Sequence, residues 1–101
     1  MSSITTALQA TGLPWVFSHF KERVEPPFLV YIQNGQVSLS ADNTRHWYRN
    51  TYQVEYYFTT KNTAFEAAIE KALLDAGFQF TRSEDIYLED EDVFVVYYYT
   101  N

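Results

Sequence analysis

The chain of 101 residues contains no cysteine, and it has only three glycines and three prolines. Without cysteine, it can form neither a disulfide nor a thiolate metal site, and thiol chemistry is excluded. No apolar run approaches the roughly 18 residues that a membrane-spanning helix needs. Residues 1–5 lack both the positive segment and the apolar segment of an export signal. We therefore expect a protein that is made and assembled in a cytoplasm and has no membrane partner.

Motifs for catalysis and cofactor binding are missing as well. His19 and His46 are the only histidines, and neither stands at a zinc-binding spacing from other ligand types. No serine lies in a nucleophile motif, and each glycine is explained as a turn or a helix cap, so a phosphate-binding loop is absent. The sequence thus predicts no catalytic residue, no cofactor and no metal ligand, and an enzyme is the least favoured class.

Apolar and aromatic side chains are abundant. Hydrophobic residues make up 47% of the chain and aromatic residues 19%, with nine tyrosines. This is enough to build a core, and the length suits one domain over residues 1–101. Tyrosine tolerates half-burial with a wet hydroxyl, which is typical of a β-rich domain with adhesive surfaces.

Charge is distributed unevenly along the chain. Residues 1–50 hold four Lys and Arg against three acids, and residues 51–101 hold three against ten, so the halves carry +1 and −7. The total of −6 is unsuited to nucleic-acid binding through the overall field of the protein. It is compatible with a channel that nucleic acid crosses without sticking.

The pattern of the first half predicts a short helix and several strands. Residues 3–12 form an N-terminal helix capped by Ser2 or Ser3 and ended by Gly12. Strands are expected over 15–20, over 28–32 and, with clear alternation of apolar and polar residues, over 48–58. We expect Asn34-Gly35 to stop the second strand, because this dipeptide favours tight turns, and residues 36–44 to be turn-like.

The second half predicts the main helix and a hairpin. Thr63 and Glu66 have the spacing of a capping box, and Gly77 is expected to end the helix. The expected apolar stripe consists of Phe65, Ala68, Ile69, Ala72, Leu73 and Ala76. Residues 78–88 and 93–99 would pair as a hairpin. The fold class is therefore α+β: a mostly antiparallel sheet of four or five strands, with the helix at about 63–76 on one face and a short N-terminal helix.

The C-terminal strand is apolar on both of its faces. One helix covers one face of a sheet, so the other face of residues 93–99 needs a second layer or another copy of the protein. Trp47 falls among the polar positions of the long strand, which favours a role at an interface. The candidate residues for a subunit or partner interface are Trp47, Tyr57, Val95, Tyr97 and Tyr99.

Four consecutive acids precede that strand: Glu89, Asp90, Glu91 and Asp92. The first interpretation is a hydrated hairpin tip that also prevents wrong pairing of an adhesive edge. The second is a negative rim that faces a polyanion or a basic partner. A calcium site ranks last, because the spacing of a calcium-binding loop is missing.

Several strings, taken in order, resemble one protein family. They are Leu13-Pro14 followed by Phe20-Lys21, Pro26-Pro27-Phe28-Leu29-Val30-Tyr31, Ala41-Asp42-Asn43, Tyr52-Gln53-Val54-Glu55-Tyr56-Tyr57 and Tyr87-Leu88-Glu89-Asp90-Glu91. Together, they resemble the tail-terminator, or tail-completion, proteins of long-tailed phages and prophages of Gram-positive bacteria, over about residues 13–99. Members of that family commonly have Tyr at Phe94 and often a basic residue at Asp92, so the hairpin tip of this chain is more acidic.

The resemblance implies a structural part of the virion neck or tail, assembled in the host cytoplasm. Such proteins form a homo-oligomeric, hexameric ring that ends the tail tube and joins it to the head. The implied partners are further copies of the chain, the major tail tube protein and a head-connector or stopper protein. DNA passes through the lumen without specific binding. The alternatives are another minor head–tail connector, such as a stopper, and a small acidic protein-binding module.

Overall fold

The computed structural model describes residues 3–41 and 45–101. Two helices and six strands follow one another along the chain: α1 (Ile4–Ala10), β1 (Trp15–Phe17), β2 (Phe28–Ala41), β3 (Arg45–Phe58), α2 (Thr63–Asp75), β4 (Phe80–Arg82), β5 (Ile86–Leu88) and β6 (Val93–Thr100). The predicted α+β class is confirmed, with six strands in place of four or five. No helix in the described part is long and apolar enough to cross a membrane.

The six strands form one mixed, mostly antiparallel sheet. Its order is β1-β2-β3-β6-β4. β5 also pairs with β6, over residues 93–95, whereas β4 pairs with residues 98–100. Only β1 runs parallel to its neighbour, over Trp15–Phe17 against Leu29–Tyr31. This strand is shorter than the one expected over residues 15–20 because the chain turns away after Phe17.

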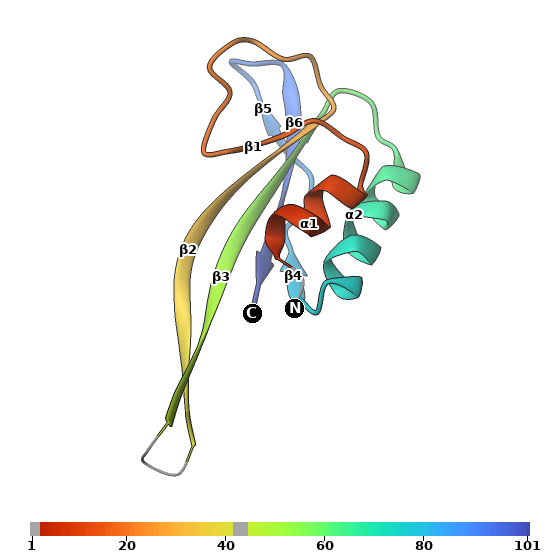
Figure 1. The fold of residues 1–101 in the computed structure, drawn as a ribbon. Coiled ribbons are helices and arrows are strands. Elements are labelled where there is room, and N and C mark those ends of the chain that lie inside the picture. Colours follow the sequence, from red (N-terminus) through yellow and green to blue (C-terminus); the bar gives the residue numbers. More distant parts are fainter. Residues whose placement is uncertain (1–2, 42–44) are drawn as a thin grey trace.

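Both helices lie on the same face of the sheet, which we call the helix face (Figure 1). The core between the helices and the sheet is made by Leu8, Ile69 and Leu73 from the helices and by apolar side chains of β2, β3 and β6. Those strand residues are Leu29, Val54, Tyr56, Phe58, Val96 and Tyr98, all of which are buried. Their alternation with half-exposed residues confirms the period of two predicted for the long strand.

The opposite side of the sheet, which we call the second face, is partly covered by residues 18–27. The aromatic ring of Phe20 meets Phe28 edge-on at 5.2 Å, and Phe28 stacks on Tyr57 at 5.0 Å. Figure 1 shows this loop at the end of the molecule where β5 turns into β6. This loop covers only one part of the second face, and the remaining part of that face is not covered by it.

The ends of the helices follow the sequence with one exception. The hydroxyl of Ser3 caps α1, and Gly77, at φ 89°, follows α2 in a Schellman motif in which Phe78 N–H donates to Leu73 O at 2.9 Å. The predicted capping box of Thr63 and Glu66 is wrong. The N-cap is Asn62, whose Oδ1 accepts a hydrogen bond from Phe65 N–H at 3.0 Å.

The apolar stripe of α2 is also shifted from the prediction. Ile69, Ala72 and Leu73 are buried as expected, but Phe65 is 36% exposed and Ala68 is exposed. Glu66 is buried in their place. The reason lies outside the helix, because two cations from distant parts of the chain reach the carboxylate of Glu66.

The predicted stop at Asn34-Gly35 is wrong, as is the turn over residues 36–44 so far as they are described. β2 continues to Ala41 and absorbs the dipeptide as a register shift between Gln33 and Gly35. The hydroxyl of Thr51 donates to Asn34 Oδ1 across the pair at 2.8 Å, and a Cβ at Gly35 would lie only 3.1 Å from Thr51 Oγ1. The same residue types that favour a turn here form a β-bulge.

Beyond the bulge, β2 and β3 leave the body of the protein as a two-stranded ribbon. Residues 35–41 and 45–51, which we call the arm, pair with each other, and within the described part of the chain no third strand joins them. The molecule is therefore elongated, with extents of 51 × 25 × 24 Å. Figure 1 shows the arm and the β5–β6 turn at opposite ends.

Replacement of Gly77 by alanine tests the end of α2. Nothing lies within 4 Å of a Cβ placed there, so the effect should come from the left-handed backbone rather than from a clash. We expect Gly77→Ala to lower the free energy of unfolding by about 1 kcal/mol in urea titrations. Gly77→Asn is the matched control and should cost less, because asparagine tolerates this conformation. Equal stability of the alanine variant and the wild type would contradict this assignment.

Candidate interaction surface

Residues 89–92, which we call the acidic turn, connect β5 to β6. All four acids are exposed. Asp92 adopts φ 55° and its N–H donates to Leu88 O at 2.8 Å, which closes the turn. Its Oδ1 accepts a hydrogen bond from the Tyr87 hydroxyl at 2.5 Å, and this bond raises the pKa of Tyr87. The turn thus has a defined backbone conformation and presents four exposed negative charges.

Nothing in the described residues brings three potential ligands together for a metal ion. The four acids of the acidic turn are exposed, and within the described residues the bond between Asp92 and Tyr87 is the one side-chain hydrogen bond that they make. Such carboxylates can interact with a basic surface through charge without a built ion site.

The second face carries the three candidate tyrosines and Val95. Val95 is fully buried between its register partners Tyr57 and Ile86, so in the single chain it offers no surface to a partner. Tyr57 and Tyr97 are half-buried, and Tyr99 is 37% exposed. The rings of Tyr97 and Tyr99 stack at 6.2 Å. On the second face, exposure therefore increases from Val95 through Tyr97 to Tyr99.

Glu55 lies at the centre of this patch. It accepts hydrogen bonds from the Tyr57 hydroxyl at 2.6 Å and from Gln53 Nε2 at 2.8 Å, and it stands opposite Tyr97 in the register. Burial, followed by the bond to Glu55, raises the pKa of Tyr57 well above its usual range. The second face is therefore aromatic and negative, in agreement with the charge of the C-terminal half.

Trp47 lies in the arm, where its backbone pairs with Leu39. Its side chain lies outside the part that the structure describes, as does that of His46. The role of Trp47 as an interface residue thus stays a prediction. Its backbone position far from Tyr57 and Tyr97 separates the five candidates into two regions, the arm and the body.

A cavity of about 670 Å³ opens between residues 18–27 and the acidic turn. Its apolar lining includes Phe20, Phe28 and Tyr57, and its charged lining includes Asp90 and Glu91. The other lining residues are Ser18, His19, Glu22, Arg23, Val24, Pro26, Val30, Leu88 and Val93. Sequence reasoning missed this cavity, because nothing local in residues 18–27 shows that they fold over the second face.

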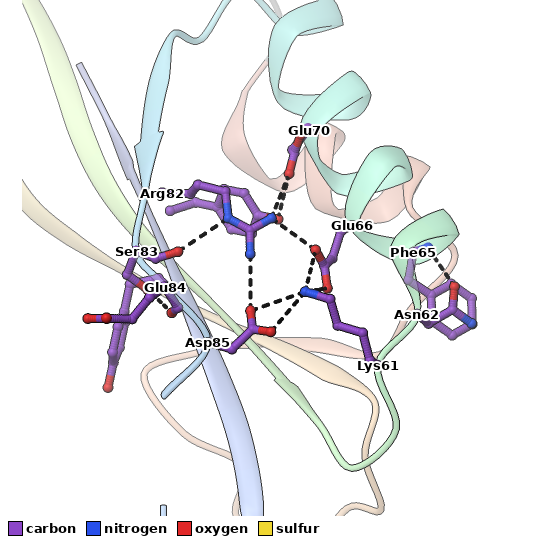
Figure 2. A network of polar contacts seen from close by, with 11 residues as sticks. Lys61, Asn62, Phe65, Glu66, Glu70, Arg82, Ser83, Glu84 and Asp85 are labelled. Carbon is purple, nitrogen blue, oxygen red and sulfur yellow. Dashed lines mark hydrogen bonds and ion pairs between the residues drawn. The ribbon is translucent and has the colours of Figure 1, made fainter. Parts of the chain in front are cut away.

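A network of ion pairs around one buried carboxylate, on the helix face, was missed as well (Figure 2). The carboxylate of Glu66 has only 6% of its surface exposed and lies 2.8 Å from Lys61 Nζ and 2.9 Å from Arg82 Nη1. Lys61 Nζ donates a hydrogen bond to Glu66 Oε1 at 3.1 Å, whereas its closer contact with Oε2 is an ion pair without the alignment of a hydrogen bond. Asp85 joins both cations, at 2.9 Å from Lys61 and 3.2 Å from Arg82.

The network holds an interruption of the sheet against α2. Residues 83–85 separate β4 from β5, and Ser83 bridges the gap by exchanging two hydrogen bonds with the backbone of Tyr97. Arg82, at the end of β4, binds Glu66 of the helix, and Asp85, the last residue of the gap, pairs with Arg82 and with Lys61. Hydrogen bonds to Glu66 and Asp85 raise the pKa of Lys61. The role that follows is structural, because a buried carboxylate needs these cations to stay charged.

Two tyrosines of the helix face differ in how their hydroxyls are satisfied. Both side chains are fully buried, but the Tyr98 hydroxyl donates to Glu70 Oε2 at 3.0 Å, whereas the Tyr56 hydroxyl has no hydrogen-bond partner among the described residues. Burial, with the Glu66 carboxylate adding to it, raises the pKa of Tyr56 to about 12.

A scan against protein-family models finds no match to this chain, and a search of curated proteins finds none either.

The two tyrosines make a matched pair for mutation to phenylalanine. Tyr98→Phe removes a made hydrogen bond and leaves Glu70 with one donor fewer, and we expect it to lower the free energy of unfolding at neutral pH by about 1 kcal/mol. Tyr56→Phe removes an unsatisfied hydroxyl and should leave stability unchanged or raise it by about 1 kcal/mol. Urea unfolding measures both, and a larger loss in Tyr56→Phe than in Tyr98→Phe would contradict the assignment.

The pKa of Tyr56 also predicts an alkaline effect. The unfolded chain loses the Tyr56 proton near the ordinary pKa of 10.0, whereas the folded protein keeps it up to about 12, so the free energy of unfolding falls as the pH rises through this window. Stability of the wild type should therefore fall more steeply across this window than that of Tyr56→Phe. Parallel pH profiles of unfolding for the two proteins would overturn the assignment.

Proposed function

We propose that the chain is a structural subunit of the neck or tail of a long-tailed phage. In this proposal, copies form a ring that ends the tail tube and joins it to the head, with DNA passing through the lumen. Its partners are further copies, the major tail tube protein and a head-connector protein. It acts without catalysis or a cofactor, as part of the virion.

The arm is the observation that carries this proposal. An isolated two-stranded ribbon is at best marginally stable in water, and its two free edges present unpaired backbone groups to other chains. Here such a ribbon extends away from the core of a protein 51 Å long. Neighbouring copies can cover it, and a head-to-tail contact repeated from copy to copy can close into a ring.

Charge and sequence supply further support. The net charge of −6 disfavours DNA binding, which suits a subunit that DNA must pass. The resemblance to tail-terminator proteins covers about residues 13–99 and agrees with a ring. Another connector, such as a stopper, has the same requirements. The cavity beside Asp90 and Glu91 is the observation that favours the second candidate, a small acidic protein-binding module.

Shortening the arm tests the need for it. A variant in which an Asn-Gly turn replaces residues 37–49 should close between Gln36 and Asn50, which pair in the register. We expect it to fold, because the core residues lie outside the deleted segment. It should remain monomeric where the wild type assembles, as measured by light scattering after size exclusion. If the shortened protein assembles at the same concentrations as the wild type, the arm is not needed for assembly.

Particles that lack the protein test its place in the virion. Deletion of the gene from a phage that carries it should give overlong tails without heads in electron microscopy if the subunit is a terminator. Filled heads that leak DNA would indicate a stopper in its place. Normal virions from the deletion would overturn the proposed function in both forms.

A further inference from the structure

The cavity at one end of the molecule has the chemistry of a site for a basic, partly aromatic segment. Phe28 and Tyr57 provide an aromatic wall, while Glu22, Asp90 and Glu91 supply three negative charges. Arg23 is the one arginine of the lining, and it lies 3.9 Å from Glu25, outside the lining, with both side chains largely exposed. A volume of about 670 Å³ accommodates several side chains.

The arm at the other end carries matching chemistry. Arg49 is exposed, and Arg45 stands four residues before it in β3, with Trp47 between them. Elsewhere in the described chain, Lys61 and Arg82 are bound in the network beneath α2, and Lys71 pairs with Asp75. Lys21 and Arg23 are exposed, but they lie in the loop that borders the cavity itself. The arm therefore combines cations with an aromatic residue on an element that reaches away from the body.

A chain cannot use its own arm to fill its own cavity, because the two lie at opposite ends of the molecule (Figure 1). We propose that the arm of one copy docks into the cavity of the next, with Arg49 directed at Asp90 and Glu91. This rests on the proposed function, which supplies the neighbouring copy. The contact joins two different surfaces, so it repeats head-to-tail and leads to a closed ring or an open chain.

The second face extends the same contact. The patch of Glu55, Tyr97 and Tyr99 is continuous in register with Tyr57 at the cavity wall. A docked arm that follows this direction would cover tyrosines that are half-exposed in the single chain. The negative charges of the cavity and of Glu55 then favour the positively charged arm over an acidic segment, since like charges across such a contact are strongly disfavoured.

Charge reversal tests the pairing. We expect Arg49→Glu and Glu91→Arg, each alone, to raise the dissociation constant for self-association by about ten-fold or more in analytical ultracentrifugation. The combined variant restores opposite charges and should return to within about three-fold of the wild type. The wild-type association should also weaken as salt is raised.

Two matched controls separate this contact from a general effect of charge. Lys71→Glu changes an exposed cation on α2, and Glu84→Arg changes an exposed acid that does not line the cavity. Both should assemble like the wild type, and circular dichroism should show every variant folded.

The possible outcomes test the docking of the arm separately from the proposed function on which it rests. If the wild type assembles and the single variants assemble equally well, or if the combined variant fails to recover, the docking of the arm is overturned while the ring subunit stands. A wild type that remains monomeric up to millimolar concentration overturns the proposed function, and the docking falls with it.

Discussion

The unequal length of neighbouring strands governs this molecule. β3 has 14 residues, but β6 pairs with only six of them, Gln53 to Phe58. Within that overlap, each strand gains a core on the helix face and a partner on both edges. Beyond it, β3 has β2 alone, and the sheet becomes the arm. Core, second face and arm all follow from where this overlap ends, at the hydrogen bond from Tyr52 N–H to Thr100 Oγ1.

Sequence reasoning succeeded where the local pattern and the tertiary structure agree. The alternation over residues 52–58, the Ser3 cap and the Gly77 terminus each depend on neighbours in the chain. It failed at Asn34-Gly35, because a turn and a bulge need the same residue types and differ only in what lies across the strand. There, Thr51 decides for the bulge by its contact with Asn34.

In the candidate site, too, features set by the local sequence were predicted and features set by distant contacts were not. The acidic turn was evident from its composition, and its exposure follows from its charge. The burial of Glu66 could not be foreseen from α2, because it depends on Lys61 before the helix and on Arg82, which lies 16 residues away. The cavity depends on residues 18–27 returning to the second face, and no local pattern determines such a return. Val95 was expected at an interface because both faces of its strand are apolar, but in the structure it is buried within the single chain.

The bulge at Asn34 lies at the point where the arm leaves the body. A bulge bends its strand and increases the local twist, so this one residue sets the direction in which the arm points. In a head-to-tail assembly, that direction fixes the angle between successive subunits. The number of copies needed to complete a turn would then depend on a backbone irregularity that touches no partner, and its loss would alter curvature while leaving every contact surface intact.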